Sequence, residues 1–246
     1  MEIVEFRDVH KSFNGMKVHN GINLKVKEAE IVSLIGGSGS GKSVLIKEMI
    51  GLLKPDRGEV FVFGKDVVLL GEHEKQEVRK QTGMLFQGAA LFDSLSVYEN
   101  IAYPLREHLR LKEKEIAARV ADKLRMVGLE GVEDKMPSEL SGGMKKRIGL
   151  ARAIAIESKI MLYDEPSTGL DPINTQRINE LILKLRDQLG ITSMVVTHDM
   201  QSVKKITDRI AMLYDGEILM EGTWHEFEGS NLKVVNDFMS GNIEEV

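Results

Sequence analysis

The segment Gly36-Gly37-Ser38-Gly39-Ser40-Gly41-Lys42-Ser43 has the residue types and the spacing of a phosphate-binding loop. Glycines let backbone N–H groups converge on phosphate oxygens without a clash from Cβ atoms, and a following helix points its positive dipole end at the same phosphates. In this pattern Lys42 reaches the β- and γ-phosphates of a nucleotide, and the hydroxyl of Ser43 ligates Mg²⁺. The alternative is a glycine-rich turn with a solvated lysine. A buried strand before the loop and a helix from Val44 to Leu52 favour nucleotide binding.

Two neighbouring carboxylates end the apolar run from Ile160 to Tyr163. A carboxylate at the end of a buried strand beside a phosphate-binding loop can hold the hydration shell of Mg²⁺, which is the role predicted for Asp164. Glu165 follows directly and can polarise the attacking water as a general base. An ordinary pair of acids at a strand end is the alternative, and the nearby phosphate-binding loop favours the catalytic interpretation.

Two further polar residues also follow apolar runs. His198 comes after Met194-Val195-Val196-Thr197, and Gln87 comes after Met84-Leu85-Phe86. In a nucleotide-binding protein, a histidine at this place can contact the γ-phosphate, and the glutamine can reach Mg²⁺ or the attacking water. Taken singly, each is more often structural or solvent-exposed. Their order along the chain makes them candidates for catalysis.

The elements that position these residues are predicted to form an α/β core. Short, almost wholly apolar runs separated by helical patterns are typical of a parallel sheet covered on both faces. These runs are Ile31–Ile35, Met84–Phe86, Ile160–Tyr163 and Met194–Val196. Three other runs alternate apolar and polar residues and predict a small antiparallel sheet with one wet face. They are Ile3–Val9, Ile22–Lys27 and Glu59–Gly64.

Two helices have clear sequence signals. One starts after the N-cap Asp171, has Pro172 at its first position and stops at Gly190. The other is predicted from Glu115 to Val127 by a single apolar stripe. The stretch from about 88 to 157 has no convincing buried strand, so we expect a helical insertion into the α/β core.

Composition narrows the class of protein. The 246 residues carry a formal net charge of -5 and no cysteine, which disfavours a nucleic-acid partner and excludes disulfide and thiol chemistry. The first residues lack the pattern of a signal peptide, and no stretch approaches the roughly 20 apolar residues of a membrane span. If the protein works at a membrane, another chain is expected to supply the span.

The segment from Leu140 to Arg147 resembles the signature motif of ABC ATPases, which ordinary P-loop kinases and GTPases lack. Its residues Ser141, Gly142, Gly143 and Met144 stand at a helix start and would form a second phosphate-binding N-terminus. In that family the signature belongs to the neighbouring subunit and closes over the γ-phosphate of the first. The resemblance therefore implies a homodimer with two composite sites.

The resemblance covers nearly the whole chain. It implies one ABC ATPase domain over residues 1–246, with a mostly parallel core sheet, an N-terminal antiparallel β subdomain, an inserted helical subdomain at about 88–157 and a C-terminal tail at about 231–246. Phe13 takes the place of an aromatic that stacks on adenine, Gln87 is the Q-loop, Asp171 ends the D-loop segment Ser167–Asp171 and His198 is the switch histidine. The residues implied to contact ATP are Phe13, Gly36, Gly37, Ser38, Gly39, Ser40, Gly41, Lys42, Ser43 and Val44. Those implied to hold Mg²⁺, partly through water, are Ser43, Gln87 and Asp164.

The signature departs from the family pattern at Met144, where glutamine is usual, and methionine cannot donate the amide hydrogen bonds of glutamine. Because Ser141 and the two glycines remain, hydrolysis is expected to persist. The basic run Lys145-Lys146-Arg147 is predicted to be the solvated face of the signature helix, with a lipid or phosphate site as the alternative.

Two segments, 83–100 and 140–152, look like those of Mce-type lipid transporters, which include Mla systems that move phospholipid between membranes. This resemblance implies an ATPase that powers a separate integral membrane permease, with ATP and Mg²⁺ as cofactors. It places the protein peripherally at the cytoplasmic face of the inner membrane and allows a small regulatory subunit as a further partner. An ABC ATPase of a different importer or exporter is the alternative.

Two segments are left with open interpretations. Gly88–Phe92 either packs in the helical subdomain or forms part of a groove for a permease helix, with Leu91 or Phe92 as an anchor. The tail could pack on its own subunit or reach across the dimer through Leu232, Val235, Phe238 and Met239.

The rival functions are a soluble ABC ATPase of translation or DNA repair and a P-loop kinase. The first is disfavoured because such ATPases usually carry tandem cassettes or long insertions, which this sequence does not show. The second is disfavoured because P-loop kinases lack the signature segment.

Overall fold

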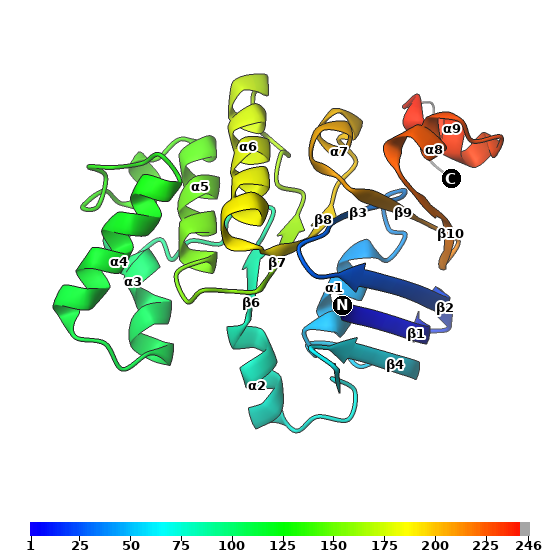
Figure 1. Cartoon of the computed structure of the whole chain (residues 1–246), viewed down its shortest axis with the longest axis horizontal. Coiled ribbons are helices and arrows are strands. Elements are labelled where there is room, and N and C mark those ends of the chain that lie inside the picture. Colours follow the sequence, from blue (N-terminus) through cyan, green and yellow to red (C-terminus); the bar gives the residue numbers. More distant parts are fainter. Residues whose placement is uncertain (242–246) are drawn as a thin grey trace.

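The computed structural model describes residues 1–241, in which two sheets and their covering helices form the molecule (Figure 1). A four-stranded sheet has the strand order β2-β1-β4-β5, and a six-stranded sheet has the order β10-β9-β3-β8-β7-β6. Figure 1 shows the helices α3, α4 and α5 gathered at one end of the molecule and the four-stranded sheet at the other. The expectation of a mixed α/β fold is confirmed.

The small antiparallel sheet is built on a hairpin whose strands run longer than the sequence pattern indicates. Its strands are β1 (Glu2–Phe13), β2 (Met16–Lys27), β4 (Arg57–Val62) and β5 (Lys65–Asp66). Phe13 pairs with Met16 across a two-residue turn of Asn14 and Gly15, both with positive φ. An Asn-Gly pair is a strong hairpin signal because both residues tolerate this conformation. That turn explains why β1 continues past Val9 and β2 begins before Ile22.

The larger sheet contains all four predicted buried strands. Its strands are β3 (Ile31–Ile35), β6 (Thr82–Leu85), β7 (Ile160–Asp164), β8 (Thr192–Val196), β9 (Arg209–Tyr214) and β10 (Glu217–Gly222). The first five are parallel, and β10 adds to β9 in the antiparallel sense. Phe86 was expected in this sheet, but it lies beyond the end of β6 and is exposed.

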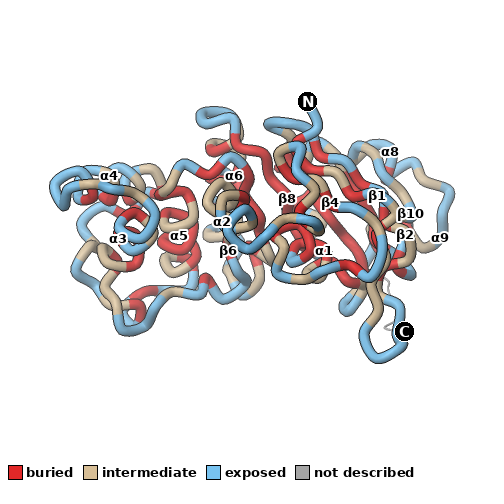
Figure 2. The backbone as a smooth tube through the Cα atoms, turned by 90° about the horizontal axis from the view of Figure 1, so that it is seen from below, coloured by how far each residue is buried: buried red, intermediate tan, exposed pale blue. Residues whose placement is uncertain are grey.

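Alternate residues of the parallel strands face two different hydrophobic clusters. Val32 and Leu34 of β3 pack toward the four-stranded sheet and α1 (Lys42–Met49), whereas Ile31 packs toward the helical side. In β7, Leu162 and Tyr163 divide in the same way. In Figure 2 red lies mainly in the interior, as in strand β8, and the outer turns are pale blue. Burial on both faces explains why these strands carry almost continuous apolar runs.

Between β6 and β7 the described chain contains helices and no strand, as the sequence pattern indicates. The helices are α3 (Val97–His108), α4 (Glu113–Met126), the 3₁₀ turn Pro137–Glu139 and α5 (Gly142–Ala153). Helix α4 begins two residues before the predicted start because Glu115 belongs to its capping box and accepts from the N–H of Lys112 at 2.8 Å. The remaining helices include α2 (Glu72–Lys80) and α7 (Met200–Ile206).

Helix α6 (Pro172–Leu189) has the caps that its sequence predicts. The side chain of Asp171 accepts hydrogen bonds from two backbone N–H groups of the first turn, and Gly190 ends the helix in the left-handed conformation. None of the helices in residues 1–241 combines the length and the apolar character needed to cross a bilayer.

The C-terminal helices pack on their own subunit. Helices α8 (Trp224–Glu228) and α9 (Lys233–Met239) bury Phe227, Val235 and Phe238 in a cluster with residues of β9 and α7. Three of the four apolar residues named for the tail, Val235, Phe238 and Met239, thus pack on their own subunit, whereas Leu232 is exposed. The predicted tail also includes 242–246, which lie outside the described residues.

Helix α1 lies between the two sheets and carries an ionisable residue into the core. Its Glu48 is fully buried, and one carboxylate oxygen lies 2.9 Å from Nδ1 of His19 on β2, which is buried as well. Neither atom has a partner in good hydrogen-bond geometry within the described residues, so the two polar side chains have only this close contact with each other. The other ring nitrogen of His19 lies 3.1 Å from the carbonyl oxygen of Gly41. Neither residue was singled out from the sequence.

We predict that His19 and Glu48 stabilise the fold only as a pair. Replacing either one alone by leucine leaves a buried group without its partner and lowers the free energy of unfolding by about 3–5 kcal/mol. The double variant His19→Leu/Glu48→Leu removes both groups and unfolds at a higher urea concentration than either single variant. Urea denaturation followed by circular dichroism measures this.

The matched control is the exposed pair Lys204 and Glu228, joined at 3.1 Å. Replacing either of these residues by leucine changes the free energy of unfolding by less than about 1 kcal/mol, because exposed ion pairs contribute little. A double variant of His19 and Glu48 whose loss equals the sum of the two single losses would contradict the interpretation.

Candidate active site

The strand order brings the predicted phosphate and catalytic residues to one edge of the six-stranded sheet. The strands β3, β8, β7 and β6 are consecutive neighbours and parallel, so their carboxyl ends meet at one edge. The glycine-rich loop follows β3, Asp164 ends β7, and His198 and Gln87 follow β8 and β6 by two residues each. Loops at the carboxyl edge of a parallel sheet are where such folds bind ligands.

Packing explains why Gly36 and Gly41 of this loop must be glycines. A Cβ on Gly36 would lie 2.3 Å from the carbonyl oxygen of Leu213, and one on Gly41 would lie 2.7 Å from a methyl carbon of Val18. Both have positive φ, which glycine alone adopts freely. At Gly37, by contrast, a Cβ would meet no protein atom within 4 Å, so the fold leaves the surface there open to a ligand.

The ammonium of Lys42 lies inside the loop. It donates to the carbonyl oxygens of Gly36 and Gly37 at 2.8 and 2.7 Å and to the hydroxyl of Ser40 at 3.3 Å. Burial lowers the pKa of this ammonium below its usual value, while the charges of Glu165 and Asp164 act in the opposite direction. A phosphate would offer these N–H groups stronger, charged acceptors in place of the loop's own carbonyls.

Ser43 and Asp164 together provide oxygen ligands suited to Mg²⁺. Ser43 Oγ donates to a carboxylate oxygen of Asp164 at 3.4 Å. Burial, together with the neighbouring charge of Glu165, raises the pKa of Asp164 above its usual value. The described residues contain no cluster of three or more His, Cys or acidic groups that could hold a metal alone. Such a two-residue site fits a Mg²⁺ ion that takes its other ligands from phosphate and water.

Glu165 sits in a strained and well-supported position. Its φ of 51° lies in the left-handed region, and its N–H donates to the carbonyl oxygen of Val196 at 2.9 Å. Its carboxylate accepts from the hydroxyl of Thr168 at 3.1 Å and lies 3.0 Å from Nδ1 of His198. The side chain of Glu165 is 16% exposed and that of His198 is 68% exposed. The carboxylate is therefore fixed in direction and reachable by water.

Two other predicted ATP contacts lie on neighbouring elements. Phe13 ends β1 and is 41% exposed, with the ammonium of Lys11 5.4 Å from its ring centre. The partner strand β2 touches the glycine loop through Val18, so the β1–β2 hairpin, which includes Phe13, lies against this loop. Val44 lies in the first turn of α1, and Gln87 is exposed beyond β6.

The signature residues start helix α5, away from the glycine loop of the same chain. Ser141 is the N-cap and accepts from the N–H of Met144 at 3.3 Å. A Cβ on Gly143 would lie 2.7 Å from Asn174 of α6, so this glycine allows α5 and α6 to pack closely beside Asp171. Figure 1 shows α6 between α5 and α1. The structure thus brings the start of the signature helix and the D-loop together.

The predicted solvated face of α5 is wrong at Lys146. This side chain is 5% exposed, and its ammonium donates to the carbonyl oxygens of Glu165, Pro166 and Thr168 at 3.0, 2.8 and 2.8 Å. Arg147 is half-buried and donates to the carbonyl oxygens of Val127 and Gly128. Helix α5 contacts α3, α4 and α6, which leaves little of its surface for solvent. The sequence pattern predicted exposure because three basic residues follow one another at this place.

The segment after Gln87 agrees in part with the core-packing interpretation, and the groove for a permease helix stays a prediction. Ala89 is buried and Leu91 packs against the helical-side core, as core packing predicts. Phe92 is 45% exposed, and its ring lies 5.1 Å from that of Tyr103, which is also half-exposed. Buried Asn100 holds the turn by donating to the carbonyl oxygens of Phe92 and Leu95.

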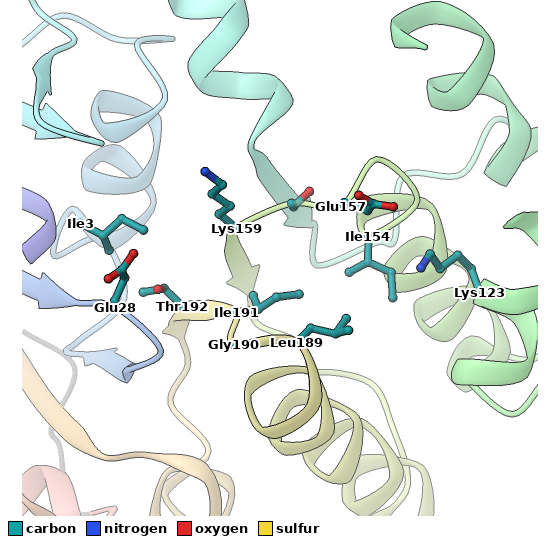
Figure 3. A pocket seen from close by; sticks show the side chains of 11 residues that line it. Ile3, Glu28, Lys123, Ile154, Glu157, Lys159, Leu189, Gly190, Ile191 and Thr192 are labelled. Carbon is teal, nitrogen blue, oxygen red and sulfur yellow. The ribbon is translucent and has the colours of Figure 1, made fainter. Parts of the chain in front are cut away.

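The structure also has a cavity of about 490 Å³ at the opposite edge of the sheet (Figure 3). Lys159 and Thr192 stand at the amino ends of β7 and β8, and Glu157, Lys123 and Leu189 complete much of its wall. No glycine loop or strand carboxyl end reaches this cavity. It is therefore separate from the candidate ATP site.

Comparison with known proteins agrees with this geometry. The family profile described as ABC transporter matches residues 19–168, more than half of the chain. The chain is 41% identical over 240 residues to the intermembrane phospholipid transport system ATP-binding protein MlaF of Haemophilus influenzae, covering 97% of this chain and 90% of that protein. It is 40% identical over 238 residues to the probable ribonucleotide transport ATP-binding protein mkl of Mycobacterium leprae, covering 97% of this chain and 69% of that protein.

A solved structure supports the same family. It is a dimeric ATP-binding cassette in a post-hydrolysis state bound to ADP and phosphate, and it superposes with a TM-score of 0.83. Its sequence is 33% identical, and the match covers 89% of this chain and 98% of that one. Together with the glycine loop, the carboxylates at the sheet edge and the signature helix, these matches show that the chain belongs to the ABC transporter family, as an ATP-binding and ATP-hydrolysing subunit that powers a transporter.

Proposed function

We propose that two copies of this chain close head to tail on two Mg-ATP molecules and that this closure drives phospholipid movement between membranes through a separate permease. The observation that carries the proposal is the position of the signature, which starts α5 beside α3 and α4, whereas the glycine loop precedes α1 beside the four-stranded sheet (Figure 1). A single chain therefore offers two half-sites. A second copy supplies the missing half of each, in agreement with the dimeric cassette to which the chain is similar.

In this proposal each residue of the sheet edge has one role. The backbone of the loop and Lys42 bind and orient the phosphates, and Phe13 stacks on the adenine. Ser43 and Asp164, with Gln87, hold Mg²⁺, which when bound neutralises charge on the transferred phosphoryl group. Glu165 accepts a proton from water as the water oxygen bonds to the γ-phosphorus, the bond to the bridging oxygen breaks, and ADP leaves. His198 holds the carboxylate of Glu165 in direction and lies ready to contact the γ-phosphate.

The proposal includes the surroundings of the subunit. Residues 1–246 form one ATPase domain, with 88–157 as its helical subdomain. The subunit lies peripherally at the cytoplasmic face of the inner membrane and contacts an integral permease, with a small regulatory subunit as a further partner. Nucleic acid is not among the proposed partners, because the chain is mildly acidic.

Phospholipid is the cargo that the similarities favour. The MlaF protein of Haemophilus influenzae is 41% identical and is named for intermembrane phospholipid transport. The mycobacterial mkl protein is 40% identical and is named for probable ribonucleotide transport, so a different cargo is the second candidate. The segments 83–100 and 140–152, which look like those of Mce-type systems, favour phospholipid.

Replacing Glu165 by glutamine is expected to preserve ATP binding and lower the rate of hydrolysis by about 10²-fold or more, because glutamine cannot accept the proton of water. ATP then accumulates in a closed dimer, which size-exclusion chromatography with bound-nucleotide analysis detects. Lys42→Ala is the contrasting variant, which loses tight nucleotide binding and remains monomeric with ATP. Hydrolysis by Glu165→Gln at the native rate would show that Glu165 is not the base.

Cargo is tested by purifying tagged protein from solubilised membranes and analysing the lipid and protein that come with it. We expect an integral permease with bound phospholipid. A matched preparation with Lys42→Ala, which retains the permease surface, controls for dependence on nucleotide. Recovery of a permease without phospholipid but with another cargo would contradict the lipid assignment, and recovery of no membrane protein would favour a soluble ABC ATPase.

A further inference from the structure

The buried ammonium of Lys146 connects the signature helix to the turn that carries the general base. Lys146 lies one turn into α5, and its three hydrogen bonds go to the carbonyl oxygens of Glu165, Pro166 and Thr168. An ammonium has three N–H donors and no acceptor, so every donor of Lys146 is used. All three acceptors belong to the segment that joins β7 to α6.

The carbonyl groups of Pro166 and Thr168 need a donor that the sheet does not supply, whereas that of Glu165 also accepts from the N–H of Thr168 at 3.3 Å. The segment follows the last residue of β7, where ladder pairing stops, and a buried carbonyl without a partner costs free energy. The backbone here is also unusual, because Glu165 has a φ of 51° and Gly169 a φ of 77°. Holding a non-glycine residue in the left-handed region requires support from its surroundings. Lys146 gives that support from a different element.

The same segment fixes the carboxylate of Glu165. Thr168 Oγ1 donates to one carboxylate oxygen at 3.1 Å, while the backbone carbonyl of Thr168 accepts from Lys146 at 2.8 Å. Lys146 thus holds both the backbone of Glu165 and the residue that orients its side chain. Burial lowers the pKa of Lys146, and the charge of Glu165 acts in the opposite direction.

We propose that Lys146 is a positioning residue for ATP hydrolysis, which fixes the Glu165–Thr168 turn so that the carboxylate of Glu165 faces the attacking water. The proposal rests on the general-base role of Glu165 given under the proposed function. The hydrogen bonds of Lys146 go neither to the glycine loop nor to the proposed Mg²⁺ ligands of its own chain. Its loss therefore affects the chemical step rather than the binding of ATP.

The test replaces Lys146 by methionine, which has similar length and no donor, and by glutamine, which keeps two donors without the charge. Steady-state kinetics on the purified protein with Mg-ATP are expected to show a kcat about tenfold or more lower for Lys146→Met, because small misplacement of a catalytic group is costly. Lys146→Gln is expected to fall between this variant and the native chain. In both, KM for ATP stays within about twofold, because the glycine loop is unchanged.

A double-variant cycle separates positioning from general damage. If Lys146 acts through Glu165, adding Lys146→Met to Glu165→Gln leaves the residual single-turnover rate unchanged within about twofold. An equal loss in both backgrounds, or a native kcat in Lys146→Met, overturns the proposal. A native rate in Glu165→Gln would instead show that Glu165 is not the base and would refute the proposed function of this residue. The two failures are therefore distinguishable.

The matched control is Lys184→Met. Lys184 of α6 also donates to a backbone carbonyl, that of Met126 at 3.3 Å, but its bond lies away from Glu165. This variant is expected to keep the native kcat. If Lys146→Met does not fold, Lys146→Gln carries the cycle. If neither Lys146→Met nor Lys146→Gln folds while Lys184→Met remains soluble, Lys146 has a purely structural role and the proposal is overturned.

Discussion

The fold depends on how closely the glycine loop approaches the strands around it. At Gly36 an added Cβ would lie 2.3 Å from a carbonyl oxygen of β9, and at Gly41 it would meet two side chains of β2. The loop therefore contacts the six-stranded sheet on one side and the hairpin of the small sheet on the other. This double contact fixes where α1 begins and explains why α1 is buried between the sheets. The rest of the candidate site is arranged around that fixed point.

The candidate catalytic residues are brought together by strand order, and the side chain of Glu165 is oriented by contacts beyond the sheet. Parallel neighbours bring Asp164, His198 and Gln87 to the same edge as the loop, although more than 100 residues separate Gln87 from His198. Strand order alone does not orient a carboxylate. Glu165 is oriented by a left-handed backbone, by Thr168 and by the turn that Lys146 holds. In the proposed mechanism, a base held in this way needs little rearrangement when water attacks.

Much of this site could be predicted from the sequence because its parts are local. The glycine loop, the strand-end acids and the caps of α6 each depend on a few adjacent residues whose chemistry permits one main structure. The burial of Lys146 and of the pair His19 and Glu48 depends on contacts across the fold. A lysine in a run of three basic residues is usually exposed, so its pattern indicated solvent. The extent of the β1–β2 hairpin had a local signal in Asn14 and Gly15, which strand alternation alone does not use.

The start of helix α5 connects this local chemistry to assembly. A helix leaves its first N–H groups without partners inside the helix, and Ser141 satisfies only that of Met144. The other N–H groups of the first turn, with the positive end of the helix dipole, favour an anion. In the proposed dimer, this anion is the γ-phosphate of a nucleotide held by the glycine loop of a second copy. Lys146 lies on the same helix and donates to the carbonyl oxygen of Glu165, so in the proposed dimer one helix connects the nucleotide of the partner to the proposed base of its own site. Under the proposed head-to-tail arrangement, hydrolysis depends on a complete dimer, because each chain would hold only half of each site.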